Sequence, residues 1–296
     1  MKANLYALAA IALWASLAAL GVSLAHVPPF LLTGIALLIG SVLAWPAVAS
    51  NPALWRVSPR MLGLGVFTLF GFHFLLFIAL RIAPAVEVNL INYLWPLLMV
   101  LLAPWYLPGV RLGAVHAIAA VTGFAGAAIA ILGGRDTPTT GENLSAVATE
   151  AFSQPALGYA LALGAAMIWG NYSLQTKRMA LQGTGASTAA IGLFGLASGV
   201  LSLLCHWALE PPVDLTGRDW LLLAVMGLGP LGAAFYLWDK ALKLGDARHI
   251  AVLSYLTPLL STVLLMATTG RALTASIAVA ALLIIGAALL GSRRTQ

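Results

Sequence analysis

One face of the segment 85–107 carries polar groups that can bind a small molecule inside a helical bundle. The helical positions i, i+3, i+4 and i+7 of this face are occupied by Asn89, Asn92, Tyr93 and Pro96. Two amides and a phenol donate and accept hydrogen bonds, and the proline interrupts the backbone hydrogen bonds of its helix. We therefore expect this face to line a binding cavity, with hydrogen bonding between packed helices as the alternative.

The segment 247–268 presents a similar face, formed by Ser254, Tyr255 and Pro258. We expect Ser254 and Tyr255 to contribute to the same cavity, again with helix packing as the alternative. Because proline cannot continue the hydrogen bonding of the preceding turn, Pro96 and Pro258 are predicted to break their helices beside the cavity and to act as gating positions.

His73 lies near the middle of the segment 61–82, on a stripe that also contains Phe70, Phe74 and Phe77. An ionisable side chain at this depth of an apolar segment is costly and usually functional, so we predict that His73 binds substrate or carries a proton. A hydrogen bond to a neighbouring carbonyl is the alternative. Glu87 is the second candidate for proton coupling, although the helix N-terminus or Arg81 explains its charge equally well.

The tryptophans fall into two groups by their position in the apolar segments. Those near segment ends fit the aromatic belt at a membrane surface: Trp45, Trp55, Trp105, Trp207 and Trp220. Trp14, Trp95 and Trp169 lie near the middle of their segments, where that explanation fails. We expect these three to form an apolar wall on which an aromatic or aliphatic side chain can stack, with helix packing as the alternative.

The elements that position these residues follow from composition. The chain has 296 residues, of which 61% are hydrophobic and 8% are charged, whereas a soluble domain has about 25% charged residues. The sequence therefore predicts an all-α integral membrane protein, since its apolar runs are long and lack strand alternation. Ten transmembrane helices are expected, near 4–25, 28–48, 61–82, 85–107, 112–132, 155–175, 186–208, 219–242, 247–268 and 272–291.

Lysine and arginine are distributed unevenly between the two sides that these helices define. With a cytoplasmic N-terminus, eleven fall inside and four outside, which predicts that both termini are cytoplasmic. The outer four are Arg81, Arg135, Arg218 and Arg271. The net charge of +6 is thus explained by membrane topology, and nucleic-acid binding is not expected.

The chain contains an internal repeat. A shift of 162 positions aligns Tyr93-Leu94-Trp95-Pro96 with Tyr255-Leu256-Thr257-Pro258, and a weaker match places Trp14 beside Trp169. We therefore divide the chain into a first five-helix repeat (1–132), an external linker (133–154) and a second five-helix repeat (155–296). Because five is odd, the second repeat enters the membrane from the opposite side, which gives the inverted topology typical of transporters with alternating access.

These features together resemble a known family. The ten spans, Trp14 and its counterpart Trp169, and the repeated Tyr-Leu-x-Pro pattern at Pro96 and Pro258 are similar to the drug/metabolite transporter superfamily, EamA type. Within it the chain is most similar to YddG-like aromatic amino acid exporters. The resemblance implies an exporter in the bacterial inner (cytoplasmic) membrane.

The sequence contains few residues that would support another class of function. Cys205 is the single cysteine, and the sequence has neither zinc-ligand spacing nor a nucleotide-binding loop, so we expect no metal, no cofactor and no enzymatic activity. No Lys or Arg falls at the middle of a predicted span, which disfavours phosphate-bearing cargo. The GxxxG motif from Gly195 to Gly199 predicts close helix packing, within the chain or in a dimer.

We conclude from the sequence that the protein exports aromatic or large neutral amino acids and related metabolites by alternating access through a central cavity. A broad drug and metabolite exporter of the same fold is one alternative, and a non-transporting membrane scaffold subunit is another. The expected partners are a small-molecule substrate and the lipid bilayer. A monomer is sufficient for this activity, and a homodimer is the alternative.

Overall fold

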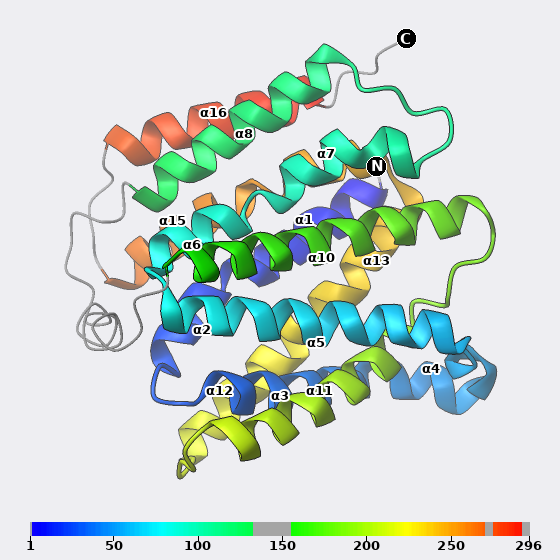
Figure 1. The fold of residues 1–296 in the computed structure, drawn as a ribbon, viewed down its shortest axis with the longest axis vertical. Helices are drawn as coiled ribbons and strands as arrows, with labels where there is room; N and C mark the ends of the chain where they lie inside the picture. Colours follow the sequence, from blue (N-terminus) through cyan, green and yellow to red (C-terminus); the bar gives the residue numbers. More distant parts are fainter. Residues whose placement is uncertain (1, 133–154, 270–274, 292–296) are drawn as a thin grey trace.

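The computed structural model describes residues 2–132, 155–269 and 275–291, and this part of the chain is built from helices and short connections without a strand (Figure 1). The predicted linker at 133–154 lies outside the described residues. By length and composition, seven helical stretches in the described part can cross a membrane, and Ala114–Ile129 and Ala275–Leu290 form shorter apolar helices. The structure is thus that of an all-helical membrane protein.

Several of the long apolar runs are divided into two helices by a short break. The first half contains α1 (Lys2–Ala15), α2 (Leu17–Ser23), α3 (Pro29–Ser41), η1 (Val42–Ala44), α4 (Trp45–Ser50), η2 (Pro52–Trp55), α5 (Pro59–Ile82), α6 (Ala85–Asn92), α7 (Trp95–Tyr106) and α8 (Ala114–Leu132). The second half contains α10 (Pro155–Leu181), α11 (Ala190–Leu209), α12 (Gly217–Leu228), the π-helical turn η3 (Gly229–Ala233), α13 (Ala234–Leu244), α14 (Ala247–Leu253), α15 (Leu256–Thr269) and α16 (Ala275–Gly291).

Helices from the two halves of the chain are interleaved. The most extensive pairings are α8 with α16, α3 with α11, α5 with α10 and α1 with α13, and each joins a helix before residue 133 to one after residue 154 (Figure 1). The two halves therefore share their packing surfaces, and a residue of one half regularly faces a residue of the other.

Small residues permit the tightest of these contacts. A Cβ on Gly199 would lie 3.0 Å from the carbonyl oxygen of Gly34, and a Cβ on Gly195 would lie 3.3 Å from that of Leu37. The close packing predicted for the GxxxG motif is confirmed, and it occurs within this chain, between α11 and α3.

The helices break near both predicted prolines. α6 ends at Asn92 and α7 begins at Trp95, while α14 ends at Leu253 and α15 begins at Leu256. Pro96 lies in the first turn of α7, where it has no N–H to donate to the carbonyl of Asn92. These interruptions free backbone groups and change the direction in which neighbouring side chains project.

Candidate functional site

A central cavity of about 720 Å³ lies between the two halves. Its lining reaches from Trp169, in the middle of α10, to Leu24 and Val27 in the connection between α2 and α3, so the cavity extends toward that end of the bundle. We call this the open end. Among the described residues, those that line the cavity include no Asp, Glu, Lys or Arg. The volume lies in the range of small-molecule sites, about 300–1,000 Å³.

Aromatic rings close the cavity away from the open end. We call them the aromatic floor: Trp14, Phe72, Trp95, Trp169 and Phe235. The ring of Trp169 is at the centre, with centroid distances of 5.7 Å to Trp14 and 5.6 Å to Phe235. Such edge and tilted contacts between rings are favourable and hold the floor in a fixed shape. Trp14, Trp95 and Trp169, predicted as an apolar wall, are therefore brought together.

Hydrogen bonds from two indole groups anchor this cluster. The Nε1 of Trp14 donates to the carbonyl oxygen of Pro230, in the π-helical turn η3, over 3.1 Å. Beneath the floor, Trp238 lies 5.2 Å from Trp14 between ring centroids, and its Nε1 donates to Ser173 Oγ over 3.2 Å. The role of Trp238 is missed by the sequence, because it falls near the end of the run 219–242.

Uncharged polar residues complete the lining. Asn89, Asn92 and Tyr93 all face the cavity, as the spacing predicted. The helix α15 adds Thr257, Pro258, Ser261 and Thr262, and α3 adds Thr33. In the described part of the chain, the buried atoms Asn92 Oδ1 and Thr33 Oγ1 have no hydrogen-bond partner, so the lining retains capacity to bind a polar ligand.

His73 lies in the lining and is held in one orientation. Its Nδ1 lies 2.6 Å from the carbonyl oxygen of Leu69, so Nδ1 carries the proton and Nε2 remains as an acceptor. The rings of Phe72 and Phe77 lie 5.1 Å and 5.8 Å from the imidazole. The carbonyl contact and the cavity position are thus both present, whereas the sequence treated them as alternatives.

Four of the predicted residues lie outside the lining. Ser254 donates to the carbonyl of Ala251, and Tyr255 is fully buried against Phe124 on the α8 side of α15. Pro96 is buried in α7, and Glu87 lies in the first turn of α6 outside the lining. Because the break between α14 and α15 falls at 254–255, a continuous-helix projection fails there, and Thr257, Ser261 and Thr262 face the cavity instead.

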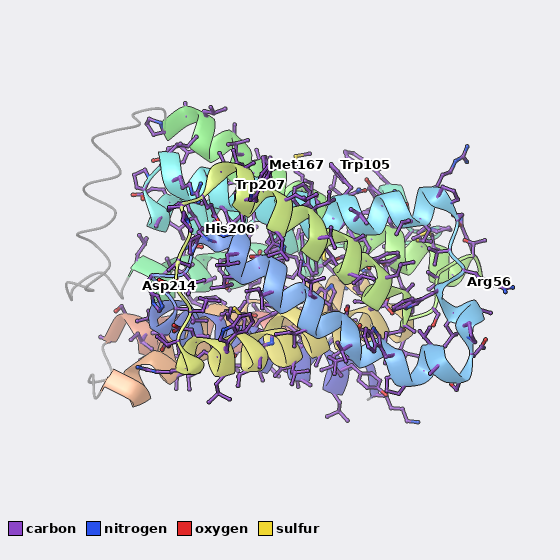
Figure 2. The ribbon with its side chains drawn as sticks, turned by 90° about the horizontal axis from the view of Figure 1, so that it is seen from below. Arg56, Trp105, Met167, His206, Trp207 and Asp214 are labelled. Carbon is purple, nitrogen blue, oxygen red and sulfur yellow. The ribbon has the colours of Figure 1, made fainter. Side chains whose placement is uncertain are left out.

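At the open end, the buried carboxylate of Glu210 connects residues of several helices. It accepts hydrogen bonds from the backbone N–H groups of Phe30 and Leu31, at the start of α3, over 3.0–3.2 Å. Arg81 donates to it over 2.6 Å, and His206 Nδ1 lies 3.0 Å away. Figure 2 shows His206 and Asp214 at this end and Arg56 at the other. The sequence offered Glu87 as a partner for Arg81, and Arg81 binds Glu210 instead.

The opposite end, which we call the closed end, contains a second ion pair with a buried carboxylate. Two residues at i, i+4 spacing on α13 form it, since Lys243 Nζ lies 2.6 Å from Asp239 Oδ2. Lys243 also donates to the carbonyl of Ala186 over 2.8 Å, and the hydroxyl of Thr188 donates to Asp239. These bonds join the end of α13 to the segment before α11.

A family model described as "EamA-like transporter family" matches residues 1–132 and 156–293 of the chain. The match covers both halves of the chain, so the chain belongs to this family of transporters. The two matched segments coincide with the two halves that the described helices form.

Proteins named aromatic amino acid exporter YddG are similar to this chain. The one from Ancylobacter novellus is 38% identical over 97% of this chain and 96% of its own length. The one from Salmonella typhimurium is 30% identical over 89% and 87%, and the one from Escherichia coli is 28% identical over 98% and 96%. A solved crystal structure is 36% identical, with a TM-score of 0.86 over 99% of this chain and 98% of the other.

Proposed function

Since the chain belongs to the EamA-like transporter family and is a multi-pass membrane protein that is not an enzyme, we propose that it exports aromatic and large neutral amino acids. The names of the relatives support this choice of substrate, and the chemistry of the cavity supports it independently. We place it in the bacterial inner membrane.

The observation that carries the proposal is the combination of an aromatic floor with an uncharged polar lining. The side chain of tryptophan or phenylalanine stacks on Trp14 and Trp169, where ring contacts contribute about 0.5–1.5 kcal/mol each beyond burial. Phosphate-bearing cargo would require cations, and the described lining has none. An amino acid is neutral overall and suits this cavity.

The two charged groups of the amino acid bind the polar part of the lining. Its carboxylate accepts from the amides of Asn89 and Asn92 and from the phenol of Tyr93, and its ammonium group donates to His73 Nε2 or lies over an indole face. This arrangement places the backbone of the substrate toward the open end and its side chain on the floor.

We further propose that the ten helical runs form two inverted five-helix repeats and that substrate crosses by alternating access. The breaks at 93–94 and 254–255 support this, because the repeat aligns Tyr93 with Tyr255. Pro96 and Pro258, beside these breaks, serve as the gating positions. The excess of Lys and Arg on the predicted inner side, which includes the closed end, supports a cytoplasmic location for that end.

The test is flux of labelled tryptophan, with phenylalanine and alanine as comparators, in proteoliposomes loaded with unlabelled substrate. Saturable exchange that prefers tryptophan to alanine supports the proposal. Equal inhibition by bulky organic cations, or flux of drugs without flux of any amino acid, identifies a broad drug and metabolite exporter instead. Absence of all flux together with a tightly bound partner in pull-downs identifies a non-transporting subunit. Repeating the assay with a pH gradient determines whether protons are coupled, with His73 as the first candidate carrier and Glu87 as the second.

A further inference from the structure

Two helices carry a continuous line of residues from the aromatic floor toward the closed end. On α13, Phe235 lines the cavity, and Asp239 and Lys243 follow one and two turns later. On α10, Trp169 lines the cavity, and Tyr172 and Thr176 follow on the same face. A second, small hollow is bordered by the later residues of both lines, which are Tyr172, Thr176, Asp239 and Lys243.

This hollow has a volume of about 20 Å³, room for about one water molecule. It is lined by α5, α10, α11, α13 and the segment 185–187. On α10, Tyr172 borders the hollow and Trp169 borders the central cavity, with 6.0 Å between their ring centroids. The hollow thus follows the central cavity along α10 and α13, in the direction of the closed end.

Asp239 and Lys243 are the charged residues of the described part that line the hollow. Asp239 is 4% exposed, and its carboxylate receives the Lys243 ammonium and the Thr188 hydroxyl. A buried ion pair gains little stability over packed apolar residues, so its retention on a transport path calls for another explanation. Lys177 also lies nearby, but its ammonium group donates to the backbone carbonyl of Lys243 and not to the Asp239 carboxylate.

We propose that Asp239 and Lys243 form a second binding site for the zwitterionic amino acid, used when the closed end opens. Asp239 binds the substrate ammonium and Lys243 binds its carboxylate. When the site is empty the two side chains neutralise each other and close the path. This inference rests on the proposed function and adds a site that is separate from the central cavity.

Exchange of partners explains why such a site can open. Separating the pair without replacement would leave the buried Asp239 carboxylate without its counter-charge, which is strongly unfavourable. A zwitterion supplies one opposite charge to each side chain at the moment of separation. A substrate that lacks either charge cannot do so, and the site therefore selects for free amino acids at the closed end.

The experiment compares the two membrane faces. Tryptophan uptake is measured in inside-out and right-side-out vesicles containing Asp239→Asn, and the closed face is identified by impermeant thiol labelling of Thr184→Cys in a Cys205→Ser background. We expect KM at the closed face to rise at least about tenfold, which corresponds to about 1.4 kcal/mol, while KM at the open face stays within about twofold. The matched control is Asp246→Asn, which breaks the exposed Asp246–Arg248 pair at the same end, away from the hollow.

A second variant removes both charges without leaving one unpaired. Asp239→Leu combined with Lys243→Met should fold, as judged by its melting temperature in detergent, and should show the same rise at the closed face. At that face the wild type should also reject N-acetyltryptophan and tryptophanamide as competitors, and the double variant should accept them almost as well as tryptophan.

The inference is overturned if both faces change equally, or if the folded double variant keeps the wild-type KM and selectivity at the closed face. Either result would leave the pair as a structural contact. Failure of the proposed function is distinguishable, because in that case the wild-type protein would show no tryptophan flux at either face.

Discussion

The guanidinium of Arg81 donates to the carboxylate of Glu210 at the point where that carboxylate caps the start of α3. The Glu210 side chain is fully buried, whereas that of Arg81 is 38% exposed. A negative charge at a helix N-terminus is favourable, and here it also meets a cation. One carboxylate therefore fixes the relative positions of α3, α5 and α11 at the open end.

Glu210→Gln should destabilise the protein by about 2–3 kcal/mol, because hydrogen bonds to charged groups contribute about 1.5–3 kcal/mol and the amide cannot accept all of the present donors. The measurement is thermal unfolding in detergent. Asp214→Asn, an exposed acidic residue on the same connection (Figure 2), is the control and should leave the melting temperature unchanged. Equal melting temperatures for both variants would refute a structural role for Glu210.

The internal repeat relates this contact to the one at the closed end. The shift of 162 positions aligns Arg81 with Lys243. Each cation lies beside the start of one of the two packed helices α3 and α11, α3 for Arg81 and α11 for Lys243. Their acidic partners differ, since Glu210 follows α11 whereas Asp239 lies one turn before Lys243 on α13. The basic residues are thus placed equivalently, and the acidic ones are specific to each end.

Trp14→Phe should weaken tryptophan binding by about 2–10-fold, because the variant loses part of a stacking surface worth about 0.5–1.5 kcal/mol as well as the hydrogen bond to Pro230. Isothermal titration calorimetry of the purified protein measures the change. Trp207→Phe, at an 85% exposed position on the outside of α11, is the control (Figure 2). Unchanged affinity in Trp14→Phe would exclude Trp14 from the substrate contact.

His73→Ala should raise the KM for tryptophan by about 2–10-fold, the effect of losing one hydrogen bond of about 0.5–1.5 kcal/mol at Nε2. If His73 also carries a proton, any dependence of exchange on a pH gradient disappears in the same variant. Both are measured in proteoliposomes at equal and unequal pH. The KM of His73→Gln, which keeps a polar group, should lie between those of the wild type and His73→Ala. Wild-type flux with wild-type pH dependence in His73→Ala would exclude both roles.

Much of the fold follows from the sequence because lipid imposes strict rules on it. Long apolar runs with turn residues between them become helices, and the runs predicted near 61–82 and 85–107 are found as α5 and as the broken pair α6 and α7. The breaks themselves shift side chains by a partial turn. Asn92 and Tyr93 reach the cavity as expected, whereas Ser254 and Tyr255, at the corresponding break in the second half, do not.

Contacts between distant parts of the chain could not be predicted in the same way. In the predicted topology, two acidic residues could pair with Arg81: Glu210, and Glu87, which is only six residues away. Nothing in a single sequence favours Glu210, the partner that the structure shows. The pair formed by Asp239 and Lys243 was predictable because it is local to one helix turn. The position of this pair beneath the aromatic floor, in contrast, could be determined only from the structure.

The backbones of α3 and η3 approach each other closely beside the cavity. A Cβ on Gly40 of α3 would lie 2.8 Å from the Cα of Gly232 and 2.9 Å from the carbonyl oxygen of Leu231, both in η3. Backbone atoms cannot yield as a flexible side chain does, so Gly40→Ala must push η3 away from α3, at a cost of about 1–3 kcal/mol. Because η3 holds the Trp14 indole through Pro230, tryptophan affinity should fall together with the melting temperature. Gly286→Ala, where a Cβ meets no atom within 4 Å, should leave affinity unchanged and stabilise α16 slightly. A loss of stability in Gly40→Ala without any loss of affinity would show that η3 does not position Trp14.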